Sequence, residues 1–422
     1  MFILITINIY TLDIFMYKNI FGQENITNIL QNEISYNPPS LAHSMIFHGN
    51  RYNGKLSAAL ETARLINCNE SKKSDCNCPN CNAVRNLTFG GLVILSRRNY
   101  YYEIIETLTC YRQKKLPHLR DKLYRAIKLS FAPLQDFLIE NTTMAESDKK
   151  QLQTLGSKFA DFIDKPEYSS TELEDIEKGA VYFHSLYKNK NIPVNTIRNM
   201  LNWSYMTLPE GKKVVIIDDV DQLELSSENV LLKRLEEPSD DLYFILLAEN
   251  NNRVLQTIRS RCRAYYFKDL SGDSKNYILT NIYQQTAPDV YSSLLDFFHQ
   301  KDPVLPKNLK VKVDKLINLV FQKNVNFSEL YLFIENEKSK ETQLGIMKEL
   351  YFIISNEISS LENENIRTEY SCLHSFSLKL LKEIEKNLKL RLERTIALNL
   401  TPKTQLEGIL YPIKEMILHA NR

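Results

Sequence analysis

The loop at residues 49–57, with the sequence GNRYNGKLS, has the clearest chemical pattern in this chain. Gly49 and Gly54 enclose four residues, and Lys55 follows them directly. Glycines at this spacing let backbone amides curl around phosphate groups, while the lysine ammonium reaches the β- and γ-phosphates of a nucleotide. The next position should provide a Ser or Thr hydroxyl for Mg²⁺, but the chain has Leu56 there. We therefore expect weak nucleotide binding at most and no hydrolysis. The two glycines would also suit a tight connection between a strand and a helix.

A second set of chemical groups follows an apolar run at residues 214–217. Asp218, Asp219 and Asp221 come directly after this run, which is rich in β-branched residues. Such a run, bounded by charge, is typical of a buried parallel strand. Open α/β sheets bind their ligands at the carboxyl ends of their strands. We therefore assign Asp218 and Asp219, together with the glycine–lysine loop, to one degenerate nucleotide site.

Four of the seven cysteines lie close together in the sequence. They are Cys68, Cys76, Cys78 and Cys81, and the last two form a Cys-Pro-Asn-Cys knuckle. Four thiolates can close a tetrahedral Zn²⁺ site, and such a site is structural because no coordination position stays open. The clustering fits a metal site in a reducing compartment better than a disulfide framework. Four free cysteines are the alternative.

Short apolar runs alternate with amphipathic segments through the first two thirds of the chain. The runs predicted as strands are residues 44–49, 90–95, 214–217, 242–250 and 264–267. Helical patterns lie between most of them, for example in the stretch NVLLKRLEEP. Strands that alternate with helices predict an α/β fold with a parallel sheet.

Four motifs, taken in order, resemble the core of the bacterial clamp-loader family of AAA+ proteins. They are the IIDDVDQL strand with its carboxylates, the NVLLKRLEEP helix, the FILLAEN strand and the tripeptide Ser260-Arg261-Cys262. The resemblance implies an AAA+ P-loop-type sheet domain with a zinc module directly after the helix that follows the glycine–lysine loop. It also implies that a small helical lid domain and an all-α collar domain follow the sheet domain.

The same resemblance implies a role for Arg261. In the family, the arginine of this motif acts in trans as a finger on the ATP of an adjacent gamma/tau motor subunit, and Ser260 and Cys262 complete the motif. Such a finger is worth about three to five orders of magnitude in turnover. The alternative is an ordinary surface arginine that caps the C-terminus of a helix.

A chain of 422 residues is long enough for more than one domain. We expect a start-site extension at 1–15, with Met16 as the natural first residue, and an AAA+ domain at 16–268. Within that domain we expect the zinc module at 68–81 and a helical insert at about 97–190. A lid domain at 269–325 and a collar domain for oligomerisation at 326–422 complete the expected organisation. The lid segment has no convincing sensor-2 arginine.

The insert has an uneven charge. Residues 97–128 carry nine Lys or Arg and only three acids, whereas acids dominate residues 136–177. Tyrosines lie among the basic residues, at positions Tyr100, Tyr101, Tyr102 and Tyr111. Basic and aromatic residues together are typical of a surface that follows single-stranded DNA. Two solvated helices of opposite charge, packed against each other, are the alternative.

The resemblance, together with the degenerate loop, implies a non-catalytic, delta-prime-like stator subunit of the DNA polymerase III clamp loader, which helps to load the sliding clamp in the bacterial cytoplasm. The expected partners are gamma/tau and delta clamp-loader subunits, the sliding clamp and primer–template DNA. The expected cofactor is structural zinc, with ATP absent or weakly bound. Basic and acidic residues nearly balance, so no global basic field indicates DNA binding, and no segment is suited to cross a membrane.

Two other functions stay open. Lys55 and the carboxylates would suit an active gamma/tau-type ATPase, although Leu56 opposes it and Asp219 stands where a glutamate would activate water. A DNA-binding adaptor that works through the insert is the second alternative.

Overall fold

The structure is a computed structural model. It describes residues 16–36, 40–96, 98–140, 142, 144–160, 162, 165–187, 192–291, 293–300, 309–321, 327–337, 340–362, 370, 373, 376–397 and 400–419. The predicted start-site extension at 1–15 lies outside these residues. The chain divides into two compact units, Met1–Phe298 and His299–Arg422, and each is described by itself.

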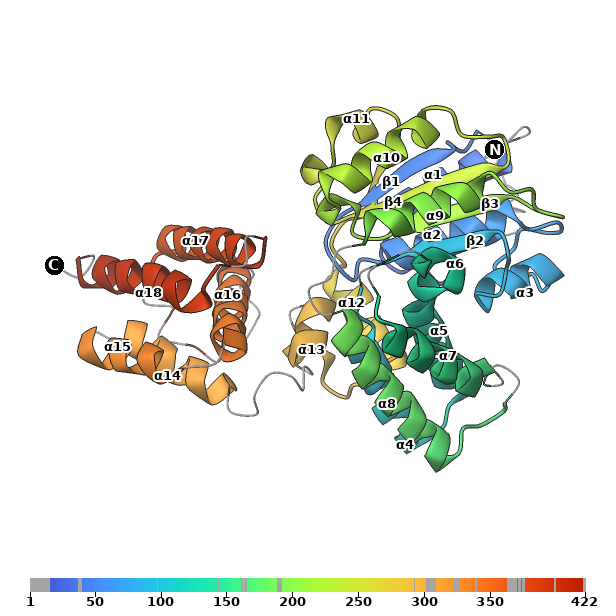
Figure 1. The fold of residues 1–422 in the computed structure, drawn as a ribbon. Coiled ribbons are helices and arrows are strands. Elements are labelled where there is room, and N and C mark those ends of the chain that lie inside the picture. Colours follow the sequence, from blue (N-terminus) through green and yellow to red (C-terminus); the bar gives the residue numbers. More distant parts are fainter. Residues whose placement is uncertain are drawn as a thin grey trace, which may run out of the picture. The chain divides into compact units, whose positions relative to one another are not determined.

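The first unit is built on a five-stranded sheet in the order β2-β3-β4-β1-β5, in which all neighbours are parallel (Figure 1). The strands are β1 (Ser44–His48), β2 (Leu92–Leu95), β3 (Lys213–Ile217), β4 (Leu242–Ala248) and β5 (Arg263–Tyr266). The predicted α/β fold with a parallel sheet is thereby confirmed. His48 pairs with Ala248 and Ile217 with Leu246, so the segments that follow β1, β3 and β4 meet at one edge of the sheet.

The helices that accompany the sheet are α1 (Glu24–Ser35), α2 (Lys55–Ile66), α3 (Pro79–Arg85), α4 (Tyr101–Lys114), α5 (Pro117–Phe131), α6 (Asp136–Ile139), α7 (Glu146–Phe159), α8 (Ser170–Tyr187), α9 (Val194–Ser204), α10 (Leu225–Glu236), α11 (Gln256–Arg259), α12 (Gly272–Asn281) and α13 (Leu294–Gln300). Successive strand side chains point to opposite faces of the sheet, so each face has a core of its own. Phe47 and Ile245 share one core with α1 and α2, and Ile46 and Phe244 share the other with α9 and α10. These helices hold the ends of the strands in place.

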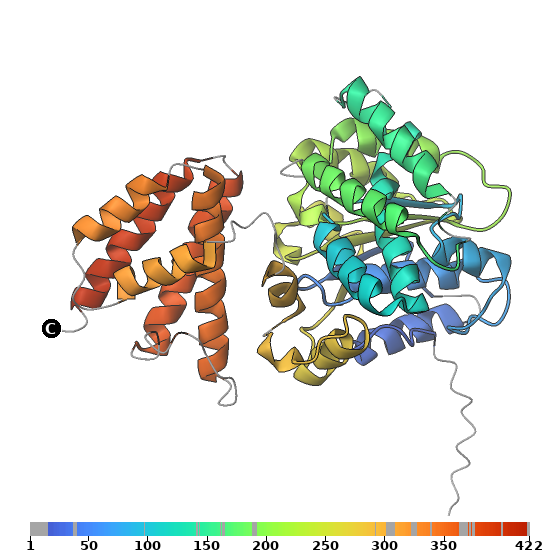
Figure 2. The ribbon, with the colours of Figure 1, turned by 90° about the horizontal axis from the view of Figure 1, so that it is seen from below.

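The segment predicted as a helical insert contains α4, α5, α6, α7 and α8, between β2 and α9. These helices lie below the sheet in Figure 1, and Figure 2 views them from that side. Leu108 of α4 and Leu123 of α5 belong to the same core as α2, so these two helices pack on the α2 side of the sheet, whereas Leu138 of α6 belongs to the core on the other side. Near its far end, α4 also reaches the segment after α12, because the Cys110 thiol donates a hydrogen bond to the backbone oxygen of Tyr283 at 3.1 Å.

The second unit is entirely helical in its described residues. Its helices are α14 (Leu309–Phe321), α15 (Phe327–Asn336), α16 (Lys340–Glu362), α17 (Leu378–Ala397) and α18 (Pro402–His419). Leu350, Leu388 and Leu410 are buried in its own apolar core. The division between the two units falls inside residues 269–325, the segment predicted as a lid. Among the described helices of both units, none has the length and apolar character needed to cross a membrane.

Candidate functional site

The glycine–lysine loop connects β1 to α2 with a backbone that requires both glycines. Gly49 has φ 143°, and an added Cβ would overlap the carbonyl oxygen of Phe267. Gly54 has φ 89° and lies in the left-handed region at the N-cap of α2. Lys55 begins the helix, but its ammonium donates to the backbone oxygens of Gly49 and Asn50, the second at 2.7 Å. In this conformation the loop binds the ammonium of its own lysine.

The position that would supply the magnesium ligand has no oxygen. Leu56 is 8% exposed and packs into the core on the α2 side of the sheet. Ser57, one residue later, is exposed. The loop therefore offers no hydroxyl at the position where nucleotide-hydrolysing relatives of this motif bind Mg²⁺.

The carboxylates after β3 differ from one another in their surroundings. Asp218 is 7% exposed, and its burial, with the charge of Asp219 beside it, raises its pKa to about 6. Ser96 donates a hydrogen bond to Asp218 at 3.3 Å. Asp221 accepts the backbone N–H groups of Glu249 and Asn250, at 3.2 and 3.0 Å, so it fixes the segment after β4. Asp221 is thus structural, whereas Asp218 and Asp219 face the loop.

An arginine within the loop binds these acids, and the sequence patterns did not single it out. One guanidinium nitrogen of Arg51 lies 3.7 Å from an oxygen of Asp219, and Nε is ion-paired with Glu249. The guanidinium therefore bridges the carboxylate after β3 and the one after β4. Arg51 was hidden in the sequence because the four residues between the glycines of this motif have no fixed type.

A cavity of about 1000 Å³ extends from the loop along the insert and the helices after the sheet. At the sheet edge it is lined by the loop, Asp218, Asp219 and Glu249. Lys122 and Arg125 of α5 line its insert wall, and α12 and α13 contribute further residues. Of the predicted nucleotide-site residues, Gly54, Lys55, Asp218 and Asp219 thus line one cavity, whereas Gly49 does not line it.

Arg261 lies elsewhere on the first unit and is not among the residues that line this cavity. It follows α11, where its guanidinium donates to the backbone oxygen of Thr257 at 2.7 Å and is ion-paired with Glu236. Its side chain is 31% exposed. Ser260 also donates to Thr257, at 3.0 Å, and Cys262 is half-buried. Arg261 thus lies apart from the predicted nucleotide-site residues that line the cavity.

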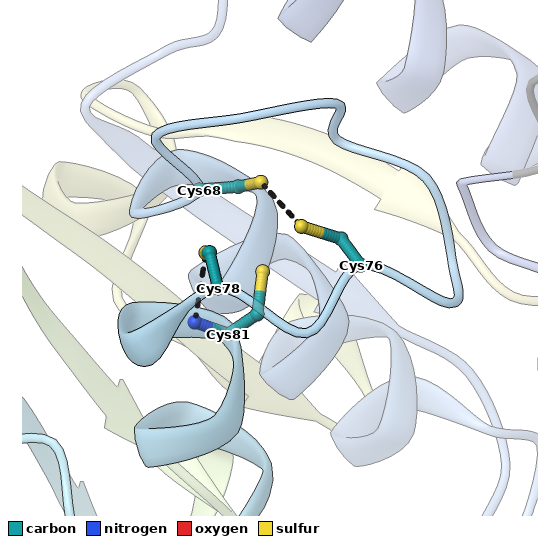
Figure 3. A group of neighbouring side chains, drawn as sticks. All are labelled: Cys68, Cys76, Cys78 and Cys81. Atoms are coloured by element: carbon teal, nitrogen blue, oxygen red, sulfur yellow. Dashed lines mark hydrogen bonds between the residues drawn. The ribbon is translucent and has the colours of Figure 1, made fainter.

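The four clustered cysteines converge on one point (Figure 3). Their sulfur atoms all lie within 4.8 Å of one another, and the Cys68 and Cys76 sulfurs are 3.6 Å apart. Four thiolates around Zn²⁺, each at about 2.3 Å, would stand about 3.8 Å apart, so the set fits this ion. Cys78 also caps α3, because its sulfur accepts the N–H of Cys81 at 3.4 Å. Although Asn77 alone separates them in the sequence, Cys76 and Cys78 both join the cluster.

Two further donors approach these sulfur atoms. The guanidinium of Arg64, from α2, lies 3.0 Å from the Cys81 sulfur, and the Lys72 N–H lies 3.3 Å from the Cys68 sulfur. A hydrogen bond from the backbone N–H of Cys78 lowers the pKa of Cys76 to about 7. Donors around the sulfurs favour thiolates, which are the form that binds metal, although burial raises the pKa of the Cys81 thiol despite the donor from Arg64.

The basic and aromatic residues of the insert do not form an open surface. Tyr100, Tyr101 and Tyr111 are buried, so their rings cannot stack on the bases of a nucleic acid. Arg112 of α4 is ion-paired with Glu177 of α8 at 2.7 Å. Other ion pairs of the same kind join Lys115 to Glu167 and Lys158 to Asp175. These contacts favour helices of opposite charge packed against each other over a surface that follows single-stranded DNA.

A family model and several known proteins match parts of the sequence of this chain. A sequence model of the family described as "DNA polymerase III, delta subunit" matches residues 22–126 and 136–271. The DNA polymerase III subunit delta' of Pseudomonas aeruginosa is 33% identical over 98 residues, which are 23% of this chain and 26% of the relative. The DNA polymerase III subunit gamma of Buchnera aphidicola subsp. Schizaphis graminum is 37% identical over 103 residues, 24% of this chain and 28% of the relative. The matches thus span about a quarter of these relatives' lengths.

A solved structure, that of a DNA polymerase III gamma subunit-related protein from Thermotoga maritima, covers 94% of this chain and 99% of its own. Its TM-score of 0.38 at 13% identity is too low to support any conclusion. The family model, in contrast, covers more than half of the chain and includes the loop, the carboxylates and the cysteine cluster. The chain therefore belongs to the DNA polymerase III delta subunit family of clamp-loader proteins.

Proposed function

We propose that this chain is a non-catalytic, delta-prime-like subunit of the bacterial replicative clamp loader, which lends Arg261 to a neighbour that hydrolyses ATP. One observation carries the proposal: Arg51 bridges Asp219 and Glu249 beside a loop whose metal-ligand position is Leu56. The guanidinium binds Asp219, which stands where a glutamate would activate water, and Leu56 provides no hydroxyl to hold a nucleotide-bound Mg²⁺. Without the ion, the charge that develops on a transferred phosphoryl group is not neutralised.

The placement of Arg261 is consistent with action on another chain. Its guanidinium is partly exposed, and Glu236 and the Thr257 carbonyl hold it at the surface after α11. A preoriented arginine loses little conformational freedom when it meets a phosphate, which suits a finger. The same contacts also describe an ordinary helix cap, so the assignment depends on the functional test.

Zinc is the metal that we propose for the cysteine cluster. The four sulfurs match its tetrahedral preference, and the absence of an open position makes the ion structural. It would link the end of α2 to α3 and so support the helix that begins at Lys55. In the same proposal α12, α13 and α14 correspond to the lid, and α15 to α18 correspond to the collar that joins gamma/tau and delta subunits.

An active gamma/tau-type ATPase is the second candidate, because gamma is also among the similar proteins and Lys55 and Asp218 are present. Leu56 and the Arg51 bridge oppose it. The burial of Tyr100, Tyr101 and Tyr111 and the pairing of several insert charges count against the DNA-adaptor alternative.

The test measures DNA-stimulated ATP hydrolysis by this chain alone and by a clamp loader reconstituted with its gamma/tau and delta partners and the sliding clamp. We expect no ATP hydrolysis by the chain alone. In the reconstituted complex, Arg261→Ala should lower the hydrolysis rate at the affected site at least a hundredfold. Arg259→Ala, two residues earlier at the end of α11, is the matched control. Turnover by the isolated chain would support the ATPase, and an unchanged rate with Arg261→Ala would refute the finger.

A further inference from the structure

Two cations on the insert wall of the large cavity lack a carboxylate partner. Lys122 and Arg125 lie three residues apart on α5, which places them on neighbouring positions of one helix face. The Lys122 ammonium lies 3.8 Å from the ring centroid of Tyr283. The Nε atom of Arg125 is buried and has no hydrogen-bond partner. Among the described residues, no acid is ion-paired with either side chain.

Lys122 and Arg125 are half-buried, and this partial removal from water costs free energy in the ligand-free protein. Removal from water disfavours a charged group unless an opposite charge or an acceptor compensates it. Burial accordingly lowers the pKa of Lys122 to about 8 and also lowers the pKa of Arg125. An anion bound in the cavity would offset this free-energy cost for both side chains.

The acids that line the cavity do not supply that anion. Asp219 and Glu249 are bound to Arg51. Glu103 is ion-paired with Arg98, and Asp121 with Arg120. The buried Asp218 has a raised pKa, so it holds its proton more readily than an ordinary aspartate. The described lining therefore has cations in excess on the insert side.

The cavity is also large enough for more than a single small ion. Its volume of about 1000 Å³ lies at the upper end of the range for small-molecule sites. An aromatic wall lies next to Lys122, since the rings of Tyr283 and Phe298 are 5.2 Å apart and those of Tyr52 and Phe298 are 4.7 Å apart. Such a wall can hold a planar ring while the cations hold charge.

We propose that Lys122 and Arg125 form an anion site for a chain of two or three phosphates, bound without Mg²⁺. The insert, and not the glycine–lysine loop, supplies the cations. The phosphates can belong to a nucleoside polyphosphate or to inorganic pyrophosphate or tripolyphosphate. This inference does not rest on the proposed role of Arg261, because it concerns binding by the isolated chain and requires no neighbour.

The experiment is isothermal titration of the full chain with ATP and with tripolyphosphate, each in EDTA and again in Mg²⁺. We expect binding in EDTA, and a loss of at least tenfold in affinity for the double variant Lys122→Met/Arg125→Gln. Lys128→Met is the matched control, because Lys128 is on the same helix and also lies over a tyrosine ring, that of Tyr124, but does not line the cavity. Tighter binding of ATP would assign the nucleoside compound, and equal affinities would assign the phosphate chain alone.

A second readout separates binding from folding. Because the double variant removes two half-buried charges that have no carboxylate partner, its melting temperature without ligand should equal or exceed that of the unchanged chain. Tripolyphosphate should raise the melting temperature of the unchanged chain only. The proposal is overturned if the unchanged chain binds neither compound at millimolar concentration or if the double variant binds as well as the unchanged chain. Binding that requires Mg²⁺, and that Lys55→Met alone abolishes, would also overturn it by placing the phosphates in the loop.

Discussion

Asp218 offers a quantitative test of how the sheet edge is built. Its burial raises the pKa from the ordinary 3.8 to about 6, so the folded chain binds a proton more tightly there than the unfolded chain does. A difference of about two pKa units corresponds to about 3 kcal/mol. Because the pKa is raised, the ionised carboxylate destabilises the folded chain at pH values above about 6. This cost disappears as the pH falls below about 4.

Asp218→Asn should therefore stabilise the chain at pH 7.5 by up to about 3 kcal/mol, which corresponds to a melting-temperature rise of roughly 5 °C in a domain of this size. The asparagine keeps an acceptor for the N–H of Asp219, and its amide can donate to Ser96. At pH 4.5 the gain should shrink to a fraction of its value at pH 7.5. Thermal unfolding of the first unit at both pH values is the assay, with the exposed Asp240→Asn as the control. A variant that is less stable at pH 7.5, or equally stabilised at both pH values, would refute the reasoning.

Three further predictions concern neighbouring features. Gly49→Ala should destabilise the first unit by about 1–3 kcal/mol in urea unfolding, because its Cβ would overlap the Phe267 carbonyl, and a loss below about 0.5 kcal/mol would contradict the geometry. Leu56→Thr should leave the isolated chain without ATP hydrolysis, because Arg51 still binds the carboxylates; measurable phosphate release would show that Arg51 does not block the site. Metal analysis of the purified chain should find about one zinc ion per chain, and Cys81→Ser should lower both the zinc content and the melting temperature. Metal-free chains with unchanged melting would contradict the zinc assignment.

Features that depend on neighbouring residues could be predicted from the sequence. The aliphatic runs that became β3 and β4 are visible because a strand buried on both faces must be apolar at every position. The carboxylates after β3 and the loop after β1 could be placed at one edge because parallel strands end at the same side of a sheet. The cysteine cluster was visible in the same way, since the knuckle holds two of its sulfurs within three residues.

Features that depend on distant residues could not be predicted. Arg51 acquires its partners only when the ends of β3 and β4 come together, about 170 and 200 residues later in the chain. The tyrosines of the insert looked suited to DNA because a short run such as Tyr100 to Tyr102 does not reveal which face of a helix is buried. Lys122 and Arg125 belonged to a basic stretch in the sequence, and only the packing of α5 beside Tyr283 separates them from the exposed members of that stretch.

The contact between the insert and the segment after α12 has a mechanical consequence. Besides the Cys110 bond, the ammonium of Lys114 donates to Gln284 at 2.7 Å, and the amide of Gln285 donates to Glu106 at 3.0 Å. A hinge between the sheet and α12 cannot change its angle unless these bonds break, because α4 is itself anchored in the core beneath the sheet. The insert thus fixes the angle of the helices that follow the sheet. The sheet, the insert and α12 are therefore expected to move as one body.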